Sequence, residues 1–110
     1  MVTYTNEMMF KHLKKLLKKI QKEYEVRKML LFGSRARGDY FLDSDVDIII
    51  ISPQFEGVFF TQRMANISEK WEGKVDIEPL CYTPEEFERK KKQIGIVKQA
   101  VKEGIEITFK

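Results

Sequence analysis

Two aspartates separated by a single valine stand directly before four isoleucines, and this spacing constrains the fold more than any other feature of the chain. The pair is Asp45 and Asp47, and the isoleucines occupy positions 48–51. A short apolar run of this kind predicts a buried β-strand, in which successive side chains point to opposite faces. We therefore expect both carboxylates on one face, where that strand begins.

Two carboxylates on one face repel each other unless a cation lies between them. Oxygen ligands of this kind suit Mg²⁺, with Mn²⁺ as a substitute. We interpret Asp45 and Asp47 as metal ligands and expect Ser44 to cap the turn that presents them. An isolated acidic pair is usually a solvated turn or strand edge, so this interpretation depends on the surrounding motifs.

A glycine and a serine follow the preceding apolar segment. The segment at 28–32 predicts a strand, and Gly33 and Ser34 come directly after it, before a short helix that carries Ala36. Glycine lets the backbone approach a phosphate, while a hydroxyl and the first helical N–H groups can donate to its oxygens. The spacing matches neither a Walker loop nor a dinucleotide fingerprint, and Gly38 is expected to serve the turn.

A third carboxylate is available on a later segment. Residues 74–80 predict a strand in which Asp76 and Glu78 share one face. Neighbouring strands lie about 4.8 Å apart, so either side chain can reach a site built on the first pair. Asp76 is preferred because Glu78 precedes Pro79, where we expect the strand to end.

These motifs together resemble the minimal nucleotidyltransferases of the DNA polymerase beta superfamily. The matching pieces are Gly33-Ser34, Ala36-Arg37-Gly38, Ser44-Asp45-Val46-Asp47-Ile48 and Val75-Asp76-Ile77. The resemblance covers nearly the whole chain and implies a single nucleotidyltransferase domain at 1–110. It implies a polymerase beta-like α/β fold, with a small mixed sheet and helices mainly on one face.

The resemblance also implies a reaction. An acceptor hydroxyl would attack the α-phosphate of a nucleoside triphosphate, here ATP, and release pyrophosphate. Asp45 and Asp47 would ligate two Mg²⁺ ions, and Asp76 would ligate the ion that activates the acceptor hydroxyl. Gly33, Ser34 and the adjacent N–H groups would hold the β and γ phosphates.

Two arginines near the glycine have two possible roles. Arg35 and Arg37 can neutralise charge on the triphosphate or on the pyrophosphate leaving group. Equally, each can form a salt bridge with Asp39 or Asp43. The sequence leaves both roles open.

Small members of this family resemble antitoxins paired with a HEPN-domain ribonuclease toxin, which implies AMP transfer from ATP to a tyrosine of such a partner. A second candidate is nucleotidylation of a small molecule such as an aminoglycoside, although no second domain is expected to complete its pocket. The third candidate is a non-catalytic module that neutralises a toxin by contact alone. A homodimer is a further candidate assembly. The aromatic residues Phe55, Phe59 and Phe60 form a candidate patch for a partner or for the dimer, although such residues near a helix are more often part of the core.

Charge and hydropathy limit the other classes of function. The chain has 110 residues, and its 20 basic and 17 acidic residues leave a net charge of +3. A lysine-rich face on the first helix is typical of a solvated surface, so nucleic-acid binding is not expected. There is no apolar run long enough for a membrane span and no signal sequence, so we expect a cytoplasmic protein.

The remaining pattern predicts alternating helices and strands. Helices are expected at about 6–24, 58–71 and from Pro84 after the N-cap Thr83, then again after Gly95. Alternating apolar residues at 105–109 predict a last short strand. The single cysteine, Cys81, is expected to be a buried apolar residue, and the only histidine, His12, to lie at the surface.

Overall fold

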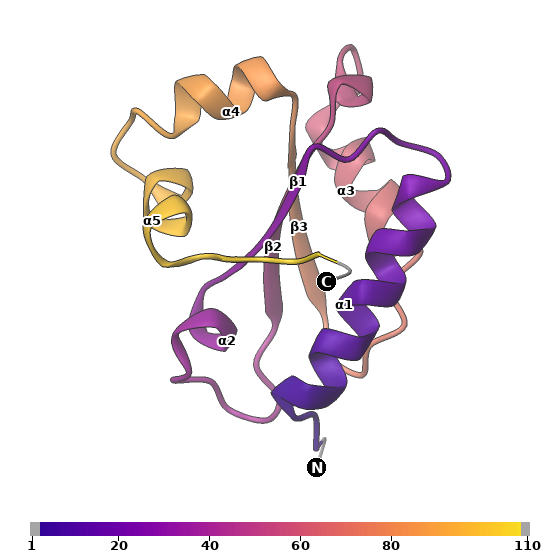
Figure 1. Ribbon diagram of the computed structural model, residues 1–110, viewed down its shortest axis with the longest axis vertical. Coiled ribbons are helices and arrows are strands. Elements are labelled where there is room, and N and C mark those ends of the chain that lie inside the picture. The colour runs from indigo at the N-terminus through magenta and orange to yellow at the C-terminus, as the bar shows by residue number, and fades with distance from the viewer. Residues whose placement is uncertain (1–2, 109–110) are drawn as a thin grey trace.

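The fold is described from a computed structural model, which describes residues 3–108. The helices are α1 (Asn6–Gln21), α2 (Ser34–Arg37), α3 (Phe60–Ser68), α4 (Pro84–Lys90) and α5 (Ile96–Glu103), with a 3₁₀ turn, η1, at Pro53–Phe55. The strands are β1 (Lys28–Phe32), β2 (Val46–Ile51), β3 (Ile77–Tyr82) and β4 (Ile105–Glu106) (Figure 1). Apart from η1, the order of helices and strands is the predicted one.

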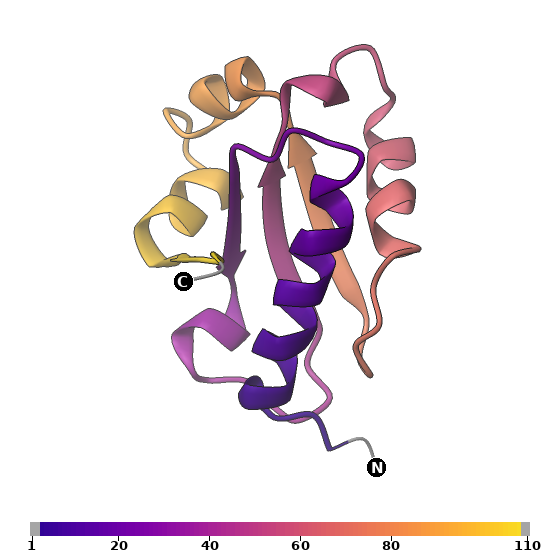
Figure 2. The ribbon, with the colours of Figure 1, turned by 45° about the vertical axis from the view of Figure 1, so that its right-hand side comes forward.

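The strands form one mixed sheet in the order β3-β2-β1-β4. β1 pairs antiparallel with both β2 and β4, whereas β2 and β3 run parallel. Parallel neighbours need a crossover, and α3 supplies it (Figure 2). The first residues of β2 and β3 therefore lie next to the last residues of β1, at one end of the sheet. The sequence motifs lie at this end.

Helices lie on both faces of the sheet (Figure 1). α1 and α3 pack on the face that carries Val46, Ile48 and Ile50. α4 and α5 pack on the other face, against Ile49 and Ile51. The predicted mixed α/β fold is confirmed, with the second face covered more fully than expected.

Several boundaries differ from the predicted ones. α1 and α3 are shorter than expected, ending at Gln21 and Ser68. β3 begins at Ile77 and not at 74, and it continues through Pro79 to Tyr82. Proline is tolerated there because β3 is an edge strand, where the missing N–H removes no ladder hydrogen bond. The last strand is only Ile105–Glu106, and residue 109 lies outside the described residues.

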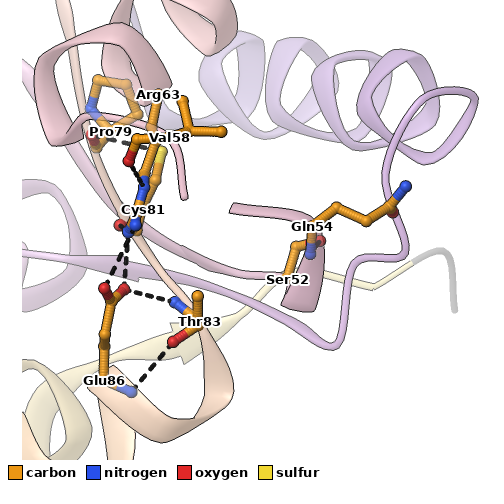
Figure 3. A network of polar contacts seen from close by, with 8 residues as sticks. All are labelled: Ser52, Gln54, Val58, Arg63, Pro79, Cys81, Thr83 and Glu86. Atoms are coloured by element: carbon orange, nitrogen blue, oxygen red, sulfur yellow. Dashed lines mark hydrogen bonds and ion pairs between the residues drawn. The ribbon is translucent and has the colours of Figure 1, made fainter. Parts of the chain in front are cut away.

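A buried ion pair closes the end of the sheet opposite the motifs (Figure 3). Arg63 donates to both carboxylate oxygens of Glu86, at 2.6 and 3.2 Å, and to the carbonyl oxygens of Val58 and Cys81. Glu86 also accepts from the N–H of Thr83, whose hydroxyl caps α4 in return. This capping box confirms the predicted helix start, and the ion pair joins α3 to α4.

Three predictions about single residues have clear outcomes. Cys81 is fully buried, as predicted, and burial raises the pKa of its thiol to about 12. His12 is half-buried at the surface of α1, where its ring stacks on Tyr4 and meets Trp71 edge-on. Phe55 is buried too, so it cannot belong to an exposed patch. None of the helices among residues 3–108 has the length and apolar character to cross a bilayer.

Candidate active site

Asp45 and Asp47 stand at the beginning of β2, as the spacing predicted. Asp45 precedes the strand and is exposed, while Asp47 is half-buried within it. Asp47 pairs in register with Phe32 of β1. Because Ile49 and Ile51 pack on the α4–α5 face, side-chain alternation directs Asp47 to that same face.

The glycine before α2 lies against the Asp47 carboxylate. Gly33 has φ +76, and a Cβ built there would come within 2.4 Å of Asp47 Oδ2. Both the backbone conformation and the contact therefore require glycine. We expected glycine in order to admit a phosphate, and the structure adds that it admits the carboxylate.

Ser34 begins α2 directly after Gly33, at the edge that carries the aspartates. The N–H groups of Ala36 and Arg37 both donate to the Gly33 carbonyl at 3.0 Å. The N–H groups of Ser34 and Arg35 stand in the first turn, where a helix offers them no acceptor of its own. These donors and the Ser34 hydroxyl are the groups available to a phosphate at this edge.

The later strand brings two further carboxylates to the same edge. Glu78 is level with Asp47 in the parallel pairing, and the Asp76 carbonyl accepts from the Val46 N–H at 2.9 Å. The argument against Glu78 is wrong, since β3 continues through Pro79. Asp45, Asp47, Asp76 and Glu78 are called the acidic edge below.

A cavity of about 410 Å³ opens beside this edge. Asp45, Asp76 and Glu78 line it, and Met64 and Trp71 are among the other lining residues. Asp47 does not line this cavity and instead lies against the Gly33 loop. The acidic edge thus separates a glycine side from a side lined by apolar and aromatic groups.

Crowding of negative charge changes the chemistry of Asp47. Burial is the largest cause that raises its pKa, to about 6, followed by the hydrogen bond and negative charge of Glu78 and then by Asp45. Arg37 acts in the opposite direction. A group held in this way favours a positive partner, because a cation relieves both the repulsion and the burial penalty.

The kind and number of oxygen donors at the acidic edge fit Mg²⁺ or Mn²⁺. As the side chains stand, no three acidic, histidine or cysteine side chains within residues 3–108 lie close enough together to hold a metal ion. The raised pKa of Asp47 and its contact with Glu78 show that these carboxyl groups are close enough to interact. We retain Asp45, Asp47 and either Asp76 or Glu78 as the candidate ligands.

The two arginines have different positions. Arg35 is buried, with 1% of its surface exposed, and its guanidinium donates to three carbonyl oxygens and to the Asn6 side chain. The carbonyls belong to Tyr4, Leu42 and Ser44. The structure therefore places Arg35 in the interior instead of at the predicted phosphate site, because all of its N–H groups have protein acceptors.

Arg37 is exposed on α2 and near enough to Asp47 to affect its pKa. It pairs with Asp39 at 3.2 Å, as one of the two predicted roles requires, and with Glu103 of α5 at 3.4 Å. Exposed pairs of this kind are weak, so Arg37 remains able to turn toward a triphosphate.

Sequence reasoning missed some groups around the site. Glu103 reaches Arg37 from α5, and Met64 and Trp71 come from α3 and the loop after it. Their contacts join segments far apart in the chain, and the local patterns contain no signal for them. Only the strand register, once known, identifies Glu78 as the neighbour of Asp47.

Known proteins share this arrangement of sequence and fold. A family model described as a nucleotidyltransferase domain matches residues 13–106. A Methanocaldococcus jannaschii protein named "Putative protein adenylyltransferase" is 35% identical over 74 residues, which make up 66% of this chain and 74% of that protein. A second protein of that organism, with the same name, is 42% identical over 43 residues, or 37% of this chain and 43% of that protein.

A solved structure supports the fold. It is the crystal structure of "a putative nucleotidyltransferase" from Sulfolobus solfataricus, and it matches this chain with a TM-score of 0.67 at 24% identity. The match covers 92% of this chain and 80% of that one. At this level of identity the similarity shows a common fold and no more.

Proposed function

The chain belongs to the nucleotidyltransferase-domain family, and from that premise we propose that it transfers AMP from ATP to a hydroxyl of a protein acceptor. The observation that carries the proposal is the acidic edge beside the Gly33 loop, with Asp47 touching the glycine that precedes α2. An anion-binding helix start next to oxygen ligands for a divalent cation is the combination that a nucleoside triphosphate requires.

The residues divide the work between the two sides of the acidic edge. On the glycine side, Ser34 and the first N–H groups of α2 bind phosphate oxygens, and Arg37 turns from Asp39 to the triphosphate. On the cavity side, Asp76 or Glu78 accepts the proton of the attacking hydroxyl. The acceptor oxygen bonds to the α-phosphorus as the bond to pyrophosphate breaks.

Asp45 and Asp47 hold the metal, with Asp76 or Glu78 as the additional ligand. When bound, Mg²⁺ supplies positive charge for the phosphates and lowers the pKa of the acceptor hydroxyl. Two ions are expected, as in the reaction that the family resemblance implies.

The finer proposal concerns the acceptor. Two relatives carry the name protein adenylyltransferase, which supports a protein acceptor for this chain. We propose a tyrosine of a HEPN-domain toxin, which would make the chain an antitoxin. The cavity beside the acidic edge supports an aromatic side chain, because Met64 and Trp71 offer it apolar and ring contacts.

The test is incubation with α-labelled ATP and Mg²⁺, with and without a co-expressed HEPN-domain protein, followed by mass spectrometry of both proteins. The proposal predicts added AMP on a partner tyrosine, with a loss on the order of 10³-fold in Asp45→Asn, because several kcal/mol of charge stabilisation disappears. Asp43→Asn is the matched control, since Asp43 is an exposed acid on the same loop.

Two other outcomes separate the alternatives. Mg²⁺-dependent ATP binding without transfer would identify a different acceptor, such as a small molecule. Toxin neutralisation that survives in Asp45→Asn would establish a non-catalytic module. Trp71 is the only tryptophan of the chain and lines the cavity with Asp45, so its fluorescence reports metal and nucleotide binding directly.

A further inference from the structure

A groove of about 550 Å³ lies between α4, α5 and the edge strand β3, outside the site described above. Leu80 and Tyr82 of β3 line it, together with Phe60 of α3. Ile94 and Ile96, from the connection between α4 and α5, line the opposite wall. Both helices lie on the face of the sheet away from α1 (Figure 1).

The wall of this groove exposes apolar side chains that a solvated surface would not favour. Ile94 is 98% exposed and Ile96 is 62% exposed. Phe59, next to Phe60 at the start of α3, is 86% exposed. Neighbouring exposed apolar groups around a groove mark a surface that is covered by a partner.

The rim of the groove is positively charged. Arg89 and Lys90 line it, and within residues 3–108 neither forms an ion pair. The carboxylate of Glu86 also lines the groove, but Arg63 and the Thr83 N–H already bind it (Figure 3). The groove therefore offers apolar contacts together with two available cations, which suits an acidic partner.

The groove and the acidic edge lie along the same face of β3. Glu78, Leu80 and Tyr82 alternate along β3, so their side chains share one face of the strand. A strand rises about 3.3 Å per residue, which separates Leu80 from Glu78 by roughly 7 Å. A segment held over Leu80 thus has its adjacent residues beside the acidic edge.

We propose that this groove binds a segment of the acceptor protein, one with apolar side chains that fill it and acidic side chains that pair with Arg89 and Lys90. The inference rests on the proposed function and adds to it, because it places the acceptor hydroxyl by docking the chain around it. The acceptor is then selected by residues near its hydroxyl as well as by the hydroxyl itself.

A protein segment fits the groove better than a nucleic acid does. The apolar lining is largely aliphatic, and Tyr82 is only 8% exposed, so its ring offers little surface for a base to stack on. The aliphatic residues are Leu80, Ile94, Ile96 and Val97.

The test is direct binding, measured by fluorescence anisotropy. The probe is a short labelled peptide with leucines, one tyrosine and flanking glutamates, compared with a peptide carrying lysines in place of the glutamates. The acidic peptide should bind at least about tenfold more tightly, and the double variant Arg89→Glu, Lys90→Glu should reverse the preference. Ile94→Ser, at a fully solvated position, should weaken both peptides equally.

The matched control is Lys14→Glu, Lys18→Glu on the exposed face of α1, which should leave peptide binding unchanged. Three results would each overturn the proposal. The two peptides could bind equally well, or the control variant could lose as much affinity for the acidic peptide as the Arg89→Glu, Lys90→Glu variant does. A short RNA could also bind more tightly than the acidic peptide. Mg²⁺-dependent ATP binding, followed through Trp71 in the same samples, tests the proposed function separately. It should be the same in wild type and in the groove variants.

Discussion

The two ends of the sheet handle buried charge in opposite ways. At the end where β3 finishes, the carboxylate of Glu86 compensates the charge of Arg63. Within residues 3–108, no buried side-chain polar atom lacks a hydrogen-bond partner. At the other end, Arg35 is matched by carbonyl oxygens and the rings of Tyr4 and Tyr40. The carboxylates of the acidic edge above it have no comparable buried cation.

This difference separates a structural end from a functional one. The Arg63–Glu86 pair is compensated and joins helices. Arg35 instead holds the loop before Asp45 by its backbone, through Leu42 and Ser44, and leaves the carboxylates free of a permanent cation. At the acidic edge a cation would relieve the repulsion between like charges, whereas Glu86 already has its cation in Arg63.

Removing the cation of the Arg63–Glu86 pair should lower the stability of the protein more than any other change considered below. Arg63→Met leaves Glu86 without its cation and should lower the free energy of unfolding by about 3 kcal/mol, as seen by chemical denaturation. Mg²⁺-dependent ATP binding, followed through Trp71 at a temperature where the variant is folded, should stay close to wild type. The double variant Arg63→Met, Glu86→Leu should recover much of the stability, and a failure to do so would show that the pair contributes more than charge compensation.

A smaller loss of stability is expected when Arg35 loses its contacts with the loop before Asp45. Arg35→Lys keeps the charge but loses the planar set of donors to Leu42 and Ser44, so the unfolding free energy should fall by about 2 kcal/mol. Transfer should fall as well, because Asp45 follows that loop. Protease digestion should cut between 38 and 45. Full activity in the folded variant would mean that the loop does not position Asp45.

Two glycines with nearly the same backbone conformation test whether the contact between Gly33 and Asp47 matters for metal binding. Gly33→Ala and Gly57→Ala face the same backbone strain, with φ +76 and +77, and each should lower stability by about 1 kcal/mol. Only at Gly33 would the new Cβ meet Asp47, at 2.4 Å, whereas nothing lies within 4 Å at Gly57. Titration of Trp71 fluorescence with Mg²⁺ should therefore change in the first variant alone. Identical titrations of the two variants would show that the contact between Gly33 and Asp47 does not affect Mg²⁺ binding.

The smallest effect concerns pH. The folded protein holds the pKa of Asp47 at about 6, above its ordinary value of 3.8, so the proton is bound more tightly in the folded state. In a chelator, this contribution to stability is present below pH about 4, is lost as pH rises through about 6, and amounts to about 1 kcal/mol after allowance for solvent screening. Asp47→Asn should be more stable than wild type by that amount at neutral pH. A variant no more stable than wild type would contradict the crowding of charge.

The sequence was sufficient to predict most of the local structure and its order. The alternation around Val46, the capping residues of α4 and the apolar stripe of α1 each lie within a few residues, and all three predictions hold. The end of β3 was predicted wrongly, because Pro79 stops a central strand but not an edge strand. Whether a strand lies at an edge depends on pairing between distant segments.

The candidate site also combines features that follow from short-range sequence patterns with features that depend on the folded structure. The shared face of Asp45 and Asp47, and the position of Gly33 directly after a strand, follow from the sequence, because strand alternation and the backbone freedom of glycine are short-range properties of the chain. The interior position of Arg35, and the alignment of Glu78 with Asp47, became visible only once the chain was folded. The contact of Gly33 with Asp47 and the groove beside β3 did as well. These features arise from strand register and from which surfaces pack together, and such contacts join residues far apart in the sequence.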